Sequence, residues 1–171
     1  DIPVVYFISP QVWAWRAGRI RSIAKYVRRL LVIFPFEESF YRERGVEALY
    51  VGHPLLDRLT PSPSMDAARR RLELEGAAPV LGLLPGSRVG EITRHLPLLL
   101  RSTRQLMMER PDLRVIIAVA DGLPLDLIGS YLNQEAISAR VVQGRTYEVM
   151  AASYLILVAS GTATLEAAII G

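Results

Sequence analysis

Cysteine is absent from the 171-residue sequence, which excludes disulfides and cysteine-ligated metal sites. Only two histidines are present, and a histidine-rich metal site is therefore not expected. No apolar run reaches the roughly 20 residues that cross a bilayer, and no signal-peptide pattern opens the chain. Any membrane contact is expected to be peripheral.

The chain also lacks a large excess of either charge, because 20 basic and 17 acidic residues leave a formal net charge of only +3. Charge alone therefore does not indicate a nucleic-acid-binding protein. The hydrophobic content of 51% is enough for a substantial core and is typical of a globular protein.

Basic residues do gather in one segment, 16–29, where they alternate with apolar residues at helical spacing. We interpret this segment as a helix with a solvated basic face; the alternative is contact with an anionic membrane surface or a phosphorylated ligand. The basic residues are Arg16, Arg19, Arg21, Lys25, Arg28 and Arg29.

Short apolar runs alternate with helical patterns along the whole chain, which predicts an α/β fold with parallel sheets. A Pro-, Ser- and Thr-containing stretch interrupts the series and predicts a linker over 59–65, between domains at 1–58 and 66–171. The expected strands are 4–8, which is predicted to be buried, 30–34, 47–51, 80–84, 113–120, 140–143 and 154–158. The expected helices are 16–29, 35–44, 66–74, 91–110, 125–133 and 147–152. Two Rossmann-like domains of this kind are predicted to face a ligand cleft.

A turn with the residues of a phosphate-binding loop follows the predicted strand 80–84. Gly86 allows close approach of a ligand to the backbone, while Ser87 and Arg88 offer hydroxyl and guanidinium donors where the next helix begins. The alternative is a strand-to-helix turn that merely needs a glycine.

A second turn of this type follows the predicted strand 154–158 and contains Ser160, Gly161 and Thr162. Because the carboxyl ends of parallel strands lie along one edge of a sheet, both turns can face one crevice. The carboxylate of Glu166 accepts hydrogen bonds and would suit a ribose diol; the alternative is a first-turn acid favoured by the helix dipole.

Four residues of the first half are candidates for a ligand cleft: Trp13, Trp15, Arg16 and His53. The tryptophans follow the first predicted strand and His53 follows the third, which places them at the carboxyl ends of strands. Core packing is the alternative for the tryptophan rings. A turn histidine bonded to the backbone is the favoured alternative for His53.

The landmarks of the chain, taken in order, resemble those of the bacterial lipid-A-disaccharide synthases, which are glycosyltransferases of the two-domain GT-B type. Residues 9–16 resemble the Trp-Ala-Trp segment of that family, and residues 34–37 and 52–54 resemble its next two landmarks. Residues 84–88 with Glu91, and residues 160–166, are similar to its donor-site loops. The resemblance runs from one end of the chain to the other.

The resemblance implies transfer of 2,3-diacylglucosamine from UDP to 2,3-diacylglucosamine 1-phosphate, with inversion, to give a β-1,6-linked disaccharide phosphate. It implies no cofactor and no metal, in keeping with the lack of an Asp-x-Asp pair. Arg88 would stabilise the charge of the leaving UDP, and Glu166 would bind the ribose. The implied donor-binding residues are Gly86, Ser87, Arg88, Glu91, Ser160, Gly161, Thr162 and Glu166. The implied location is the cytoplasmic face of the inner membrane, with no nucleic-acid partner.

The resemblance implies a catalytic base, an aspartate, that would precede residue 1 of this chain. We therefore expect both domains to be incomplete and this chain alone to be inactive. Two other functions remain open. One is a different UDP-N-acetylglucosamine-using enzyme of the same fold, a transferase or a 2-epimerase. The other is a non-catalytic module that binds nucleotides or, through segment 16–29, nucleic acid.

Overall fold

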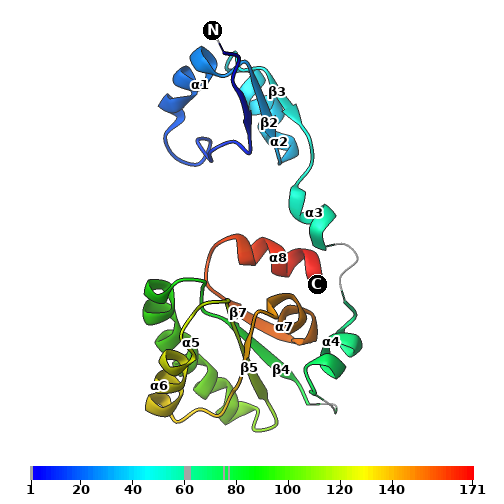
Figure 1. Ribbon diagram of the computed structural model, residues 1–171, viewed down its shortest axis with the longest axis vertical. Helices are drawn as coiled ribbons and strands as arrows, with labels where there is room; N and C mark the ends of the chain where they lie inside the picture. Colours follow the sequence, from blue (N-terminus) through cyan, green and yellow to red (C-terminus); the bar gives the residue numbers. More distant parts are fainter. Residues whose placement is uncertain (1, 60–62, 75, 77) are drawn as a thin grey trace. The chain divides into compact units, whose positions relative to one another are not determined.

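The computed structural model describes residues 2–59, 63–74, 76 and 78–171 (Figure 1). The chain divides into two compact units, Asp1–Thr60 and Pro61–Gly171, and each contains a sheet whose strands are all parallel. The predicted α/β class with two Rossmann-like sheets is thus confirmed. Of the predicted linker 59–65, residues 60–62 lie outside the described residues.

The first unit is a three-stranded sheet in the order β1-β2-β3, with a buried core between the sheet and its crossover helices. Leu30 and Val32 of β2 are fully buried and alternate along the strand, as expected where one face of a sheet packs on helices. Its elements are β1 (Val5–Phe7), a 3-10 turn η1 (Ala17–Arg19), α1 (Ile20–Tyr26), β2 (Arg29–Val32), α2 (Pro35–Arg42), β3 (Ala48–Tyr50) and α3 (Pro54–Leu59).

Two predictions for this unit are wrong. The run 4–8 is predicted to be a buried strand, but β1 is exposed along its whole length: Val5 is 59%, Tyr6 40% and Phe7 50% exposed. β1 lies at the edge of the sheet, and none of its residues belongs to the core cluster of this unit. The helix predicted over 16–29 is shorter and contains only α1 after η1. Arg16 has a left-handed backbone with φ of 91° and Val27 is extended, and neither conformation continues an α-helix.

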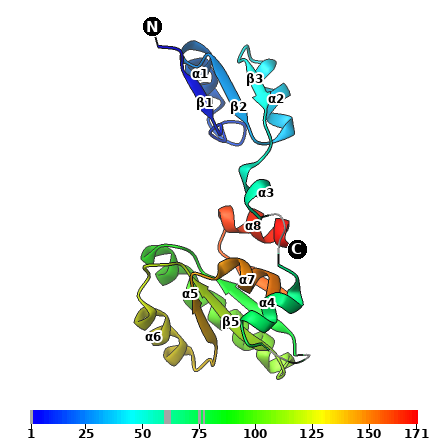
Figure 2. The same ribbon diagram turned by 45° about the vertical axis from the view of Figure 1, so that its right-hand side comes forward.

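The second unit is a four-stranded sheet with helices on both faces. In both views α5 and α6 lie on one side of this sheet, and α4 and α7 lie on the other (Figure 1 and Figure 2). Its elements are α4 (Met65–Arg71), β4 (Val80–Leu84), α5 (Val89–Glu109), β5 (Arg114–Val119), α6 (Leu125–Glu135), β6 (Arg140–Gln143), α7 (Thr146–Ala152), β7 (Leu155–Val158) and α8 (Thr162–Ile170).

The direction of the chain across this second sheet reverses once. The strand order is β6-β5-β4-β7, so the chain moves outward from β4 to β6 and then returns to place β7 on the other side of β4. Ile92 and Leu96 of α5 pack into the core on one face, whereas Ala163 and Ala167 of α8 pack against the core on the opposite face. The helices that follow β4 and β7 therefore diverge. In open α/β sheets, the carboxyl edge at such a point is where ligands bind.

Candidate functional site

The two predicted phosphate-type turns begin side by side at this reversal point. Leu84, the last residue of β4, pairs with Val158, the last residue of β7, and the amide of Ala159 donates to the carbonyl of Leu84 at 2.9 Å. The turn that contains Gly86–Arg88 and the turn that contains Ser160 and Gly161 therefore leave neighbouring strands at the same edge. The sequence predicted that both turns lie at one edge of a parallel sheet. The strand register shows in addition that the two strands before them, β4 and β7, are direct neighbours.

The turn after β4 is held by side chains of α5. Glu91 accepts a hydrogen bond from the Ser87 amide at 2.8 Å and one from Nη1 of Arg88 at 2.6 Å. His95 lies one turn further along α5, with Nδ1 3.1 Å from the carbonyl oxygen of Pro85. The Ser87 amide, followed by the Arg88 guanidinium, lowers the pKa of the Glu91 carboxyl. The carboxylate of Glu91 thus belongs to the architecture of the turn, and its predicted contact with substrate stays a prediction.

Gly86 is required by both the backbone and the packing of this turn. Its φ is 131°, and a Cβ atom at this position would lie 2.6 Å from Cβ of Glu91. Gly86→Ala is therefore expected to lower the free energy of unfolding by about 1–3 kcal/mol, measured by thermal unfolding. The control is Gly90→Ala in the first turn of α5, where a Cβ meets nothing within 4 Å and stability should stay the same or rise. Equal stability of the two variants would contradict this role for Gly86.

Arg88 presents its guanidinium to solvent at the start of α5. It is the N-cap residue, in an extended conformation, and its side chain is 79% exposed. The amides of Val89 and Gly90 follow in the first turn of the helix, where backbone N–H groups have no intrahelical acceptor. A guanidinium and helix N-terminal amides at one point are suited to an anion.

The second turn leads into α8, which carries Glu166. The hydroxyl of Tyr147, in α7, donates to Oε1 of Glu166 at 3.0 Å. Glu166 is not in the first turn of α8, which begins at Thr162 and contains no acidic residue there, so the interpretation as a first-turn acid is wrong. Ser160, Gly161 and Thr162 are exposed.

In the first unit, a buried carboxylate organises the carboxyl edge of the sheet. Glu37 is 1% exposed and accepts hydrogen bonds from the hydroxyl of Ser9 at 2.6 Å and from Nε1 of Trp13 at 3.1 Å. It also accepts hydrogen bonds from the backbone amides of Ile33 and Phe34, at 3.2 and 3.1 Å. Glu37 therefore ties the segment after β1 to the start of α2.

A line of aromatic rings connects two of the cleft candidates at this edge. Trp13 packs edge-on against Phe36, Phe36 stacks on Phe34, and Phe34 lies 5.7 Å from His53 between ring centroids. His53 also accepts the amide of Leu55 at 3.1 Å, as expected for a turn histidine bonded to the backbone. The structure thus brings Trp13 and His53 to one edge.

The other two cleft candidates are not part of this line of rings. Trp15 is 70% exposed, so core packing is the wrong interpretation for its ring, and Trp13 is itself 37% exposed. Arg16 occupies the left-handed position before η1. No ring contact of Trp15 is found within the described residues.

The comparison with known protein families matches the lipid-A-disaccharide synthetase family over residues 1–171. The chain belongs to this family. Among its relatives is the lipid-A-disaccharide synthase of Myxococcus xanthus, 46% identical over 166 residues, which are 97% of this chain and 43% of the relative. The enzyme of the same name from Geobacter sulfurreducens is 43% identical over 99% of this chain and 44% of its own length. The enzyme from Alkalilimnicola ehrlichii is 46% identical over 97% of this chain and 44% of its own length.

This lipid-A-disaccharide synthase family consists of glycosyltransferases, and the resemblance stated from the sequence is confirmed. The chain spans less than half the length of these relatives, 43–44%. Among residues 2–59, 63–74, 76 and 78–171, no three acidic or histidine side chains are grouped to hold a metal ion. None of the helices described for this family member is long and apolar enough to cross a membrane.

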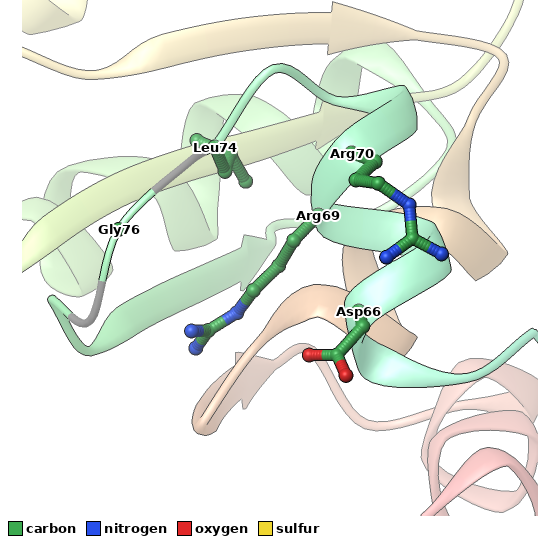
Figure 3. Close-up of a pocket in the computed structure, with 5 residues that line it drawn as sticks. All are labelled: Asp66, Arg69, Arg70, Leu74 and Gly76. Carbon is green, nitrogen blue, oxygen red and sulfur yellow. The ribbon is translucent and has the colours of Figure 1, made fainter.

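A shallow pocket of about 290 Å³ lies elsewhere in this family member, at the opposite edge of the second sheet. Figure 3 shows Asp66, Arg69 and Arg70 on α4, with Leu74 and Gly76 on the segment that leads to β4. A Cβ on Gly76 would lie 3.8 Å from the guanidinium of Arg114, the first residue of β5, which places the pocket at the amino ends of the strands. Nε of Arg69 already donates to the carbonyl of Ala152 at 3.1 Å. We do not assign this pocket to the nucleotide.

Three residues of the candidate site were missed from the sequence: Glu37, His95 and Tyr147. The spacing of Glu91 and His95, four residues apart on one helix, is a signal that could have found His95. Glu37 lies at the third position of α2, where a glutamate reaches back to the amides before the helix, and this pattern too is visible in the sequence. The contact between Tyr147 and Glu166 joins two helices, and no local pattern predicts it.

Proposed function

We propose that this chain contributes the UDP-sugar site of a lipid-A-disaccharide synthase. The reaction is transfer of 2,3-diacylglucosamine from UDP to 2,3-diacylglucosamine 1-phosphate, with inversion, to form the β-1,6-linked disaccharide phosphate and UDP. Membership of the family supports the reaction. The observation that carries the location of the site is the pairing of Leu84 with Val158, which sets two phosphate-type turns at the point where the strand order reverses.

In this proposal the diphosphate binds at the first turn. Arg88 and the amides at the start of α5 neutralise the negative charge that builds on the β-phosphate as UDP leaves, and no metal is needed for that step. Ser160, Gly161 and Thr162 hold phosphate oxygens from the second turn. The carboxylate of Glu166 accepts hydrogen bonds from the hydroxyls of the ribose. One of its oxygens, Oε1, also accepts a hydrogen bond from the Tyr147 hydroxyl.

The two units take different parts in this proposal. Residues 66–171 belong to the domain that binds the UDP-sugar, and residues 1–58 belong to the acceptor-side domain. Trp13, Trp15, Arg16 and His53 are proposed to face the acceptor, since Trp13 and His53 share the carboxyl edge of the first sheet. The enzyme acts at the cytoplasmic face of the inner membrane, as a peripheral protein.

A hybrid enzyme tests the reaction. The segment of the Myxococcus xanthus synthase that aligns with this chain is replaced by this chain, and the transfer of diacylglucosamine from UDP is measured. We expect disaccharide formation with the acylated donor and none with UDP-N-acetylglucosamine. A hybrid that unfolds cooperatively but transfers no acylated sugar contradicts the proposal. Turnover of the unacylated donor favours the alternative enzymes of the same fold.

Tyr147→Phe is expected to weaken UDP binding about two- to tenfold, because one hydrogen bond that orients Glu166 is lost. The measurement is calorimetric titration of the chain with UDP. The matched control is Tyr131→Phe in α6, on the other face of the sheet, which should leave the UDP affinity unchanged. Equal UDP affinity for the Tyr147 variant and the unmodified chain would argue against Glu166 as the ribose ligand.

A further inference from the structure

The turn that precedes α5 is bound by the side chains of two residues of that helix. Glu91 and His95 are four residues apart and therefore lie on one face of α5, one turn above the other. Both side chains reach back to the turn. Glu91 binds the amide of Ser87 and the guanidinium of Arg88, and His95 binds the carbonyl of Pro85.

The two contacts are chemically complementary. A carbonyl oxygen can only accept a hydrogen bond, so Nδ1 of His95 is the donor toward Pro85. The Glu91 carboxylate can only accept, and it does so from Ser87 and Arg88. Together the residues fix a carbonyl at one end of the turn and an amide at the other. The turn is therefore held at two points, and a Cβ atom added to Gly86 between them would lie 2.6 Å from Cβ of Glu91.

The contact with Glu91 also sets the direction of Arg88. A guanidinium has five N–H donors in a rigid plane, and the ion pair with Glu91 engages Nη1. The Arg88 side chain as a whole is 79% exposed, so the guanidinium N–H groups that do not face Glu91 are accessible to an anion. Glu91 can hold Arg88 in place and leave it able to bind phosphate oxygens in a bidentate manner.

We propose that Glu91 and His95 are positioning residues: they hold the 85–88 turn and aim Arg88 at the terminal phosphate of a bound nucleoside diphosphate. This inference rests on the proposed function, and it replaces direct substrate contact as the role of Glu91. Neither residue touches the ligand. Their effect on binding passes through Arg88 and through the shape of the turn.

The test is calorimetric titration of the 171-residue chain with UDP and with UMP. Glu91→Gln keeps an oxygen that can accept the Ser87 amide but removes the charge that holds Arg88, so UDP affinity should fall about tenfold. UMP affinity should stay the same, because the terminal phosphate is missing. His95→Ala should also lower UDP affinity, and His95→Asn, which restores an N–H donor, should recover part of the loss. Glu109→Gln, at the far end of α5, is the control and should change neither affinity.

A double-mutant cycle separates positioning from a merely structural role. If Glu91 acts through Arg88, Glu91→Gln should add no further loss of UDP affinity when Arg88 is already alanine. Full additivity would overturn the inference, as would unchanged or increased UDP affinity of Glu91→Gln alone. An equal loss of UDP and UMP affinity would overturn it too. Failure of the unmodified chain to bind UDP would overturn the proposed donor site itself, and the inference with it.

Discussion

Replacement of Glu37 by alanine is expected to lower the free energy of unfolding of the first unit by about 3–4 kcal/mol. The carboxylate is 1% exposed and accepts hydrogen bonds from Ser9, Trp13 and two backbone amides. Its removal leaves two buried donors, Ser9 and the Ile33 amide, and two partly buried ones without an acceptor. Each unsatisfied buried group costs about 1–3 kcal/mol before water or rearrangement compensates. This is the largest effect on stability that we expect from a single substitution.

Tryptophan fluorescence during urea unfolding is the measurement for Glu37→Ala. Both tryptophans of the chain, Trp13 and Trp15, belong to the first unit, so their emission reports the unfolding of that unit. Circular dichroism gives a second signal that does not depend on the Trp13 contact. The control is Glu43→Ala, whose side chain is 71% exposed and should change stability by less than about 0.5 kcal/mol. Equal midpoints for the two variants would contradict the role of Glu37.

Arg88→Ala is expected to have the largest effect on function. In the hybrid enzyme, kcat should fall about 100- to 1000-fold, because the charge that develops on the leaving UDP loses a preorganised cationic partner. In the chain alone, UDP affinity should fall about 10- to 100-fold, as expected for loss of a hydrogen bond between charged groups. Stability should change little, since the side chain of Arg88 is 79% exposed.

The control for Arg88→Ala lies on the same helix. Arg94 is an exposed arginine in the second turn of α5, and Arg94→Ala changes the net charge by the same amount. We expect Arg94→Ala to leave both kcat and UDP affinity within a factor of two or so. If the two variants lose UDP affinity equally, Arg88 contributes to UDP binding through long-range electrostatic attraction and not through a direct contact with phosphate.

Much of the second unit could be predicted from the sequence, because its central strands, β4 and β5, are largely apolar runs that are covered on both faces. The strand predicted over 80–84 coincides with β4, and the strand predicted over 140–143 coincides with β6, which lies at the edge of the sheet and is only partly buried. The first unit was predicted less well. The run 4–8 is also apolar, but whether a strand is buried depends on what packs against it, and β1 lies at the edge of its sheet with residues of both faces exposed.

The candidate site shows the same limit. The glycines and hydroxyl residues of the two turns could be recognised, because each turn follows an apolar run and precedes a helix. That β7 returns to lie beside β4 is a matter of strand order, and the order follows from packing of the whole unit. The contact between Tyr147 and Glu166 depends on that order as well. The hydrogen bonds of Glu91 and His95 with the turn depend on the backbone path of that turn, which the residue types in the turn do not determine.

Hydrogen–deuterium exchange of the chain with and without UDP tests the central claim, that the nucleotide binds at the carboxyl ends of β4 and β7. We expect slower exchange in 85–92 and 159–166 when UDP is bound, and unchanged exchange in 63–74, which contributes to the pocket on α4. Calorimetry on the same samples establishes that UDP is bound. Bound UDP with slower exchange confined to 63–74, or with no change in the two turns, would contradict the account.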